Sequence, residues 1–274
     1  MNIISLFSFI GISLGVAVLI IVMSVMNGFR TELVNKIVGF NAHVTVKPYE
    51  NQINKEKIND NYINLISKNL IFSNSGEAIV INKDYTKGLI LRGYKSKDFP
   101  KLDVIKKGNL MGNPNKLIKN NISIGKELSF DLNLKLGDKI SIMSPSGIET
   151  IIGSLPKQEI FTISSIFDSG LIDFDSNIAF INLSTLENFF GYREENRNLE
   201  IYLNNPQNIK YQKKIVQNNF PNEFVYSWSD MNSSLFSALK VERNVMFIIL
   251  SLIIIVAAFN IISGLTILVK NKTR

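Results

Sequence analysis

The side chains that could perform catalysis are few in this sequence, and none of them belongs to a complete catalytic set. His43 is the single histidine, and the chain contains no cysteine. A zinc site or a Ser-His-Asp triad needs several such groups together, so we expect neither. The lack of cysteine also excludes disulfides, and the core must be held by packing alone.

Three other patterns deserve the same test. Ser123 and Ser237 each begin a Ser-x-x-Lys segment, but the companion motifs of a Ser–Lys acyltransferase are missing. Asp168, Asp173 and Asp175 lack the spacing of a calcium loop, so we predict a solvated hairpin loop there. The sequence has no G-x-x-x-x-G-K-[ST] phosphate loop. We therefore predict a non-catalytic chain that needs no metal and no cofactor.

One loop has the composition of a contact surface. It lies between two predicted strands, is bounded by prolines and is rich in isoleucine. Apolar residues on a protruding loop favour a docking role, although they could instead fold back onto the core. The loop consists of Pro145, Ser146, Gly147, Ile148, Glu149, Thr150, Ile151, Ile152, Gly153, Ser154, Leu155 and Pro156.

Two uncharged segments indicate how the chain is held. Residues 245–269 carry no formal charge and are followed by Lys270, Lys272 and Arg274. A bilayer core needs roughly 20 apolar helical residues, and a basic cluster after a span marks the cytoplasmic side. Residues 3–26 form a second uncharged segment, too long for the apolar part of a signal peptide. We predict two membrane helices, both chain ends inside and the middle outside.

Both membrane helices are predicted to continue into the outer domain as stalks. Apolar residues recur at helical spacing from Met26 to Ile37 and from Met231 to Leu239, with Gly39 as C-cap and Ser229 or Asp230 as N-cap. Ordinary amphipathic connectors are the alternative. Gly11 and Gly15 form a GxxxG pattern, which favours close helix packing but also arises by chance.

The segment between the stalks has an α+β pattern. Strands are expected at 41–47, 78–81, 88–93, 139–143, 159–167, 178–181, 199–203 and 224–228, and helices at 58–66, 124–134, 185–190 and 209–216. Ser184 would cap the 185–190 helix, with Glu187 completing a capping box. The net charge of +7 is scattered, and the mean hydropathy of +0.14 averages a polar domain with two apolar helices. Neither value points to nucleic acid.

Several segments together resemble a known permease family. Residues 10–16 and 24–29 resemble the first membrane helix of the LolC/LolE permeases, and residues 256–261 and 269–274 resemble their second helix and its exit. Residues 124–128, 136–138 and 166–170 follow in the family's order. The resemblance covers the whole chain.

The resemblance implies a fold and a set of partners. It implies a membrane protein with an α+β periplasmic domain of the MacB-like core type, built from Porter and Sabre subdomains between two transmembrane helices with stalks. It implies a LolD-like ABC ATPase, a LolE-like second permease or a second copy of this chain, a LolA-like periplasmic carrier, membrane lipid and a lipoprotein substrate. The expected place is the bacterial inner membrane.

The resemblance also implies domain limits. They are 1–27 for membrane helix one, 28–40 and 229–244 for the stalks, 41–95 and 196–228 for the Porter-like parts, 96–195 for the Sabre-like part, 245–269 for membrane helix two and 270–274 for a cytoplasmic start. The family continues with two more membrane helices, so we interpret the chain as a fragment or a shortened product.

Site residues follow from the resemblance as well. The 145–156 loop falls at the carrier-binding hook, and Gln158 falls in the adjoining pad, where Glu159 replaces an expected basic residue. The hook favours a LolC or hybrid subunit over LolE. Val25, Met26, Phe29 and Phe259 are expected along the lipoprotein path. A two-helix sensor with a ligand-binding outer domain, or a MacB- or FtsX-like mechanotransmission permease, stays open as an alternative.

Overall fold

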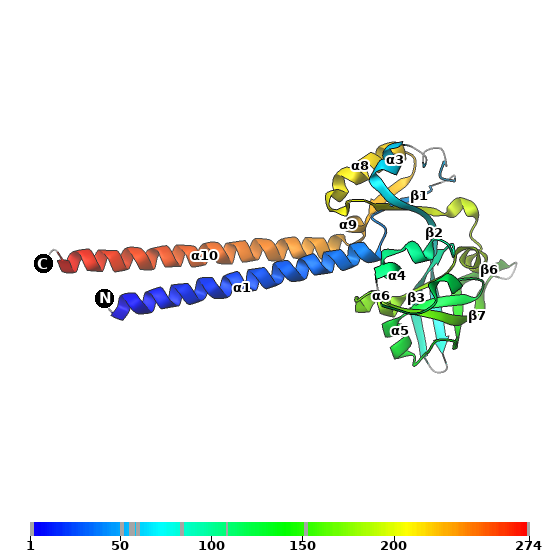
Figure 1. The fold of residues 1–274 in the computed structure, drawn as a ribbon, viewed down its shortest axis with the longest axis horizontal. Helices are drawn as coiled ribbons and strands as arrows, with labels where there is room; N and C mark the ends of the chain where they lie inside the picture. Colours follow the sequence, from blue (N-terminus) through cyan, green and yellow to red (C-terminus); the bar gives the residue numbers. More distant parts are fainter. Residues whose placement is uncertain are drawn as a thin grey trace. The chain divides into compact units, whose positions relative to one another are not determined.

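The computed structural model describes residues 3–49, 52–54, 58, 61–82, 85–107, 109–150 and 153–272. The contacts divide the chain into two compact units, one formed by residues 1–35 with 232–274 and the other by residues 36–231. Figure 1 shows the first unit as a pair of long helices and the second as a mixed α/β domain.

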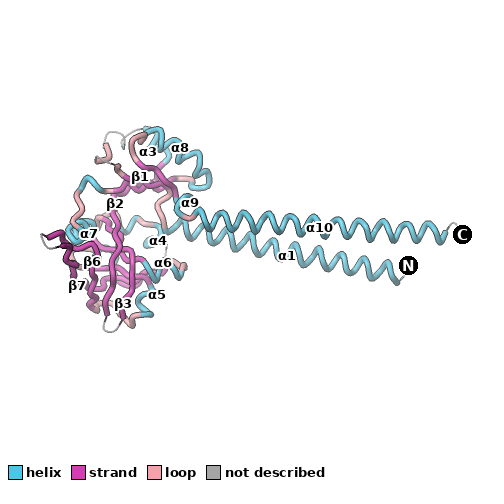
Figure 2. The backbone as a smooth tube through the Cα atoms, turned by 180° about the vertical axis from the view of Figure 1, so that it is seen from behind, coloured by secondary structure: helices cyan, strands magenta, loops and turns pink. Residues whose placement is uncertain are grey.

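The helix pair consists of α1 (Ile3–Phe40) and α10 (Ser233–Lys272). Their apolar segments, Phe9–Phe40 and Ser233–Gly264, have mean hydropathies of 2.7 and 3.0, and at most 6% of the most apolar window is buried. By length and composition, each helix could cross a membrane. Each also continues past its uncharged run without a break (Figure 2), as the stalk prediction requires.

The domain is built on a mixed sheet whose described part has ten strands. They are β1 (Val44–Lys47), β2 (Ser67–Asn82), β3 (Tyr85–Tyr94), β4 (Asn109–Gly112), β5 (Asn121–Gly125), β6 (Lys139–Thr150), β7 (Gly153–Asp168), β8 (Ile178–Asn182), β9 (Asn198–Leu203) and β10 (Phe224–Ser227). The domain helices are α3 (Asn61–Ile66), α4 (Asp103–Lys107), α5 (Lys126–Asp131), α6 (Ile172–Asn177), α7 (Leu183–Phe190), α8 (Ile209–Asn219) and α9 (Trp228–Met231).

Part of the sheet closes on itself. The pairings run from β2 to β3, β8, β5, β7 and β6, and β6 then pairs with β2 again. Closure leaves this barrel without a free edge along the ring. Its interior holds Val80, Ile122, Ile142 and Phe161, each with 0% exposure. The first half of β2 leaves the ring and pairs with β9, which is followed by β1 and β10.

Several predicted elements are wrong in extent. Ile124 and Gly125 belong to β5, and the helix begins only at Lys126. Gly125 lies against the backbone of Asp175, where a Cβ would meet an oxygen at 2.1 Å, so this position needs a glycine. Strand β2 begins at Ser67, well before the predicted start at Ala78. Its polar residues hide the strand pattern in the sequence, yet Ser73 and Asn74 are buried and hydrogen-bonded.

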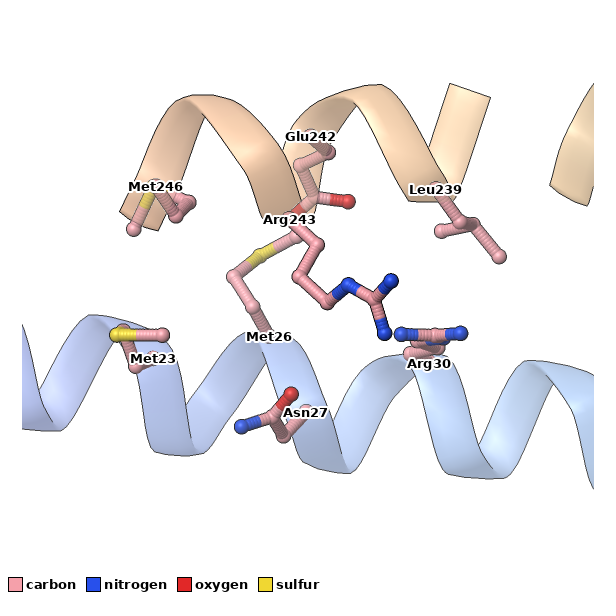
Figure 3. A pocket seen from close by; sticks show the side chains of 8 residues that line it. All are labelled: Met23, Met26, Asn27, Arg30, Leu239, Glu242, Arg243 and Met246. Carbon is pink, nitrogen blue, oxygen red and sulfur yellow. The ribbon is translucent and has the colours of Figure 1, made fainter. Parts of the chain in front are cut away.

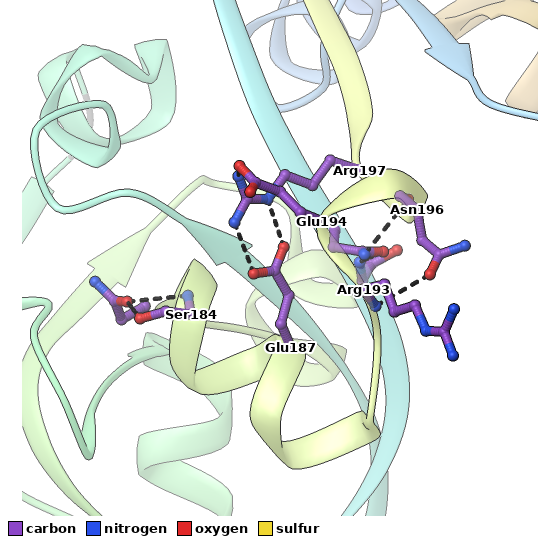
Figure 4. A network of polar contacts seen from close by, with 9 residues as sticks. Ser184, Glu187, Arg193, Glu194, Asn196 and Arg197 are labelled. Atoms are coloured by element: carbon purple, nitrogen blue, oxygen red, sulfur yellow. Dashed lines mark hydrogen bonds and ion pairs between the residues drawn. The ribbon is translucent and has the colours of Figure 1, made fainter. Parts of the chain in front are cut away.

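The predicted cap of the 185–190 helix is also wrong. Asn182 is the N-cap of α7, and its side-chain oxygen accepts a hydrogen bond from the Ser184 backbone at 3.1 Å. Figure 4 shows that Glu187 instead faces Arg197, whose Nε and Nη2 donate to the two carboxylate oxygens at 2.6 and 2.8 Å. This bidentate pair joins α7 to the start of β9.

The stalk caps differ from the prediction in the same way. Helix α1 continues through Gly39 to Phe40, and the backbone and side-chain amides of Asn41 both donate to the Ile37 carbonyl, at 3.0 and 3.3 Å. Asp230 lies inside α9, where its carboxylate accepts hydrogen bonds from the Ser227 backbone and hydroxyl, each at 2.7 Å. Ser227 and Asp230 thus form a capping box at the start of α9, and Asp230 does not cap the long helix α10.

Candidate functional site

The proline-bounded loop is the far end of the β6–β7 hairpin. The strands pair through Ser144 and Lys157 and then shift register, so that Pro145 and its next two neighbours lie opposite Pro156. Prolines cannot donate to a strand ladder, so an irregular step is the natural place for them. Pairing resumes at Ile148 and Leu155 and ends at Thr150 and Gly153. Ile151 and Ile152 lie outside the described residues.

This end of the hairpin extends beyond the barrel ring. The described pairings of β6 with β2 cover only residues 141–143, and those of β7 with β5 and β4 begin at Thr162. A two-stranded hairpin is marginal in water by itself and needs support at its base. Here the ring supplies that support. The segment is thus a paired ribbon, where the sequence predicted a loop.

The predicted pad residue lies on an exposed face at the base of this hairpin. Gln158 is exposed, and its Nε2 donates to the Ser141 hydroxyl at 2.7 Å. Ile160, two residues on, is 59% exposed. Lys157 and Glu159 occupy the alternate positions and form an ion pair of 2.9 Å with each other. The charge of Glu159 is therefore balanced within the domain by Lys157.

The glycines of the GxxxG pattern do not contact α10. A Cβ added at Gly11 or Gly15 would meet no atom within 4 Å of it. Within the helix pair, the described residues with buried apolar side chains are Leu19 and Leu239, at 7% and 8% exposed. The two helices line a common pocket between Met23 and Arg30 of α1 and between Leu239 and Met246 of α10. The open glycine face is available to a helix of another chain.

The residues expected along the lipoprotein path do not form one pocket within this chain. Val25, Phe29 and Phe259 are 64%, 59% and 65% exposed. Met26 lines a small pocket with residues of α10, among them Met246. Phe259 lies thirteen positions beyond Met246, roughly 20 Å further along a helix rising 1.5 Å per residue.

That small pocket lies where α1 and α10 run antiparallel. Figure 3 shows Met23 across from Met246 and Arg30 near Leu239. The lining residues are Met23, Met26, Asn27 and Arg30 from α1, and Leu239, Glu242, Arg243 and Met246 from α10. The pocket combines methionine side chains with two guanidinium groups.

The end of α1 is anchored by aromatic packing in the domain. Phe40 is 4% exposed, and its ring centroid lies 4.3 Å from that of Phe174, 6.0 Å from that of Phe180 and 6.2 Å from that of Phe167. Buried aromatic pairs at these distances add stabilisation beyond the buried area. A displacement of the last turn of α1 would therefore have to disturb this cluster.

A buried polar network lies beside the anchor. The carboxylate of Glu200 accepts hydrogen bonds from Ser73, Arg92, Tyr94 and Tyr202 at 2.6, 3.2, 2.9 and 2.8 Å. Arg92 also donates to Asn41 at 3.5 Å, and its guanidinium carbon lies 5.7 Å from the Phe40 ring centroid. The network links strands β2, β3 and β9 to the end of α1.

The pKa shifts agree with that charge arrangement. Burial favours the neutral form of Arg92, but Tyr94 and Glu200 outweigh this and raise the pKa of the guanidinium. Burial also raises the pKa values of the Tyr94 and Tyr202 phenols well above their usual value. Both phenols thus stay protonated, and their hydroxyl groups donate hydrogen bonds to Glu200. The sequence alone did not reveal this cluster, because Glu200 sits in an ordinary strand pattern.

The remaining residues that were considered for catalysis or metal binding have structural roles. His43 Nδ1 accepts a hydrogen bond from the Leu203 backbone at 2.8 Å, and burial lowers the pKa of His43 to about 4. Asp175 is 2% exposed and accepts from the Ser169 backbone at 3.0 Å, so the predicted solvated loop is wrong at this residue. Within the described residues, no group of three or more His, Cys, Asp or Glu side chains could hold a metal ion.

Comparison with known families defines the class. The model of the MacB-like periplasmic core domain matches residues 5–217, which include most of α1 and the domain as far as the last turn of α8. The chain therefore belongs to the family of the MacB-like periplasmic core domain.

Curated relatives define the type more narrowly. The lipoprotein-releasing system transmembrane protein LolC of Neisseria meningitidis serogroup B is 29% identical, over 99% of this chain and 67% of the relative. LolC and LolE of Haemophilus influenzae are each 28% identical, over 96% and 97% of this chain and 66% of each relative. The chain thus spans about two thirds of these relatives' length and is a LolC/LolE-type permease, in a bacterial membrane.

Solved structures with a similar domain are more distant. The periplasmic region of MacB from Actinobacillus actinomycetemcomitans has 9% identity and a TM-score of 0.40, over 72% of this chain and 94% of that one. The extracellular domain of the transporter YknZ from Gram-positive bacteria has 13% identity and a TM-score of 0.41, over 68% and 98%.

Proposed function

We propose that this chain is a permease subunit of an ABC transporter that extracts lipoproteins from the inner membrane and passes them to a periplasmic carrier. The names of the LolC and LolE relatives support this, since they belong to a lipoprotein-releasing system. A LolD-like partner would hydrolyse ATP on the cytoplasmic side. A LolE-like subunit or a second copy of this chain would complete the membrane part, with the domain of residues 36–231 in the periplasm.

Among the features of the domain, the β6–β7 hairpin is the one best suited to dock a carrier. It extends past the barrel ring and is stiffened by strand pairing on both sides of its prolines. Ile148 and Leu155 are register partners, and the sequence between them contains two more isoleucines. A pre-formed ribbon loses less conformational entropy on docking than a mobile loop. The exposed side chains of Gln158 and Ile160 lie at its base and would extend the contact.

The anchor of α1 supports mechanical coupling. A helix that continues from the apolar segment into an aromatic cluster can move the domain only by carrying that cluster with it. The Arg92–Glu200 network would spread the load over three strands. ATP-driven rearrangement of the membrane helices would then reach the carrier-docking hairpin through the domain. The Porter and Sabre limits given above remain a prediction.

The docking proposal is tested by carrier pull-down with the full chain in detergent. Ile148 and Leu155 are register partners, so the double variant Ile148→Ser/Leu155→Ser removes apolar area at one level of the hairpin. Burial of two such side chains, each in part, would contribute about 2–4 kcal/mol, or roughly 30- to 1,000-fold in affinity. We expect capture of a LolA-like carrier from the same organism to fall by that order.

The matched control is Glu149→Gln, one position along the same strand, which should bind as the parent does. The single tryptophan, Trp228, is buried in the domain, so its fluorescence reports folding of every variant. A folded double variant that captures the carrier as well as the parent would remove the hairpin from the docking site.

A further inference from the structure

On each of the two long helices, an arginine is the first charged residue at the domain end of the uncharged run. The two arginines lie at the same position along the helix pair. Arg30 is the first charged residue after the uncharged run of α1, and Arg243 is the last before the uncharged run of α10. Both residues line the one pocket in Figure 3. The first charges beyond an apolar span lie at the level of the lipid headgroups. The two guanidinium groups therefore meet at one membrane–water boundary.

The surroundings of the two arginines leave an excess of positive charge. In Figure 3 the Arg243 side chain extends from α10 toward α1 and Arg30. Within the described part of the chain, neither guanidinium has a hydrogen bond or ion pair. Glu242 lines the same pocket but carries one charge against two, so the lining keeps an excess positive charge. Two like charges held together gain stability from an anion between them.

The other lining residues fit a lipid better than a free ion. Asn27 adds an amide donor between the arginines and the membrane, while Met23, Met26 and Met246 present flexible apolar side chains on the membrane side. Methionine adapts to irregular apolar partners such as the start of an acyl chain. Arginine binds phosphate through two parallel hydrogen bonds, which a planar guanidinium is shaped to form.

We propose that Arg30 and Arg243 hold the phosphate of a membrane phospholipid between α1 and α10, at the boundary where both helices leave the bilayer. The lipid would neutralise the arginine pair and fill the gap between the helices with its glycerol region. This site needs no lipoprotein and no ATPase, so it stands or falls independently of the transport proposal.

The test is native mass spectrometry of the full chain in detergent, titrated with short-chain lipids. The probes are phosphatidylglycerol, phosphatidylcholine, diacylglycerol with the same chains, and inorganic phosphate. We expect one tightly held phosphatidylglycerol, weaker phosphatidylcholine because its choline is repelled, and no retained diacylglycerol. Inorganic phosphate should compete poorly. Competition by phosphate as strong as by the phospholipid, or equal retention of diacylglycerol, would overturn the lipid site.

Variants distinguish phospholipid binding at the arginine pair from unspecific attraction to positive surface charge. Arg30→Gln/Arg243→Gln should weaken phosphatidylglycerol binding about ten- to a hundredfold, as expected for two lost charge-assisted contacts. Lys47→Gln/Lys240→Gln removes the same charge from exposed residues outside the pocket and should leave binding unchanged. Arg30→Lys/Arg243→Lys, which retains charge and helix propensity, should bind with intermediate strength. Equal loss in the lysine-to-glutamine control would contradict the proposal.

Discussion

The barrel and the helix pair differ in the exposure of their apolar side chains. In the barrel, Val80, Ile122 and Phe161 are fully buried among one another. On the helix pair, Leu14 and Phe247 are 65% and 66% exposed, and Leu19 and Leu239 are the buried hydrophobic residues of the unit among those described. The domain thus supplies its own interior, whereas the helices leave their apolar surface for lipid and for other helices.

This difference separates two sources of stability. Unfolding the domain must expose its core to water, and the hydrophobic effect opposes that. The helix pair gains little from burial within the chain, and in lipid the association of helices depends on close packing and polar contacts. Substitutions in the domain should therefore change its free energy of unfolding, while those on the helices should change assembly.

The largest effect is expected from the buried network of the domain. Glu200→Ala leaves Arg92 without its carboxylate in a site where the two side chains are 5% and 14% exposed. Removing one partner of a buried ion pair costs about 3–5 kcal/mol, because the other charge stays buried. The measurement is denaturant unfolding of the full chain, followed by Trp228 fluorescence.

The control for this prediction is the exposed ion pair of Lys87 and Asp131. Lys87→Gln should change the free energy of unfolding by less than about 1 kcal/mol, as is usual for surface pairs. Similar losses of unfolding free energy for both variants would mean that the buried Glu200 network contributes no more to stability than an exposed ion pair.

The next effect is a pH dependence confined to the domain. His43 stays neutral in the fold because burial lowers its pKa to about 4, against 6.5 when unfolded. Asp103 opposes and Lys68 reinforces this shift. The unfolded chain therefore binds the proton first, so the contribution of His43 is complete above pH 6.5. It is lost as pH falls to about 4, at a cost of up to about 3 kcal/mol.

His43→Asn provides the comparison for that window. The asparagine oxygen can accept the Leu203 amide in place of Nδ1 but does not titrate. The free energy of unfolding of the parent should fall more than that of the variant between pH 7 and 4.5. Parallel curves would assign the acid sensitivity to the carboxylates instead.

The smallest effect should appear on the helix pair and only in assembly. Gly15→Leu fills space that no other part of the chain occupies, so Trp228 fluorescence unfolding should be unchanged. Close packing against a helix of another subunit would be lost, at about 1–2 kcal/mol. Recovery of the second permease and the ATPase on co-purification measures this.

Ser13→Leu is the matched control for that experiment, since it lies two residues away and therefore on a different side of the helix. If both variants assemble as the parent does, the GxxxG pattern has no packing role. If Gly15→Leu also destabilises the domain, the helix pair and the domain do not have separate sources of stability.

Much of the architecture could be predicted from local pattern. The two uncharged runs, the stalk continuity of α1 and α10 and the strand that begins after Gly137 follow from composition and periodicity. Gly137 has a φ of +87°, which glycine adopts without strain and which turns the chain into β6. Misassigned elements, such as the start of β2 and the cap of α7, involve polar residues whose partners are distant in sequence.

The sequence by itself determined that two apolar helices flank an α+β domain, because length and charge distribution decide whether a segment can span a bilayer. Only the tertiary structure decided that six strands close into a ring, that Glu200 collects four donors from the three strands β2, β3 and β9, and that Arg30 and Arg243 share one pocket. The physical reason is the same for all three. Each depends on groups far apart along the chain, whose energies act only after folding brings them within contact distance.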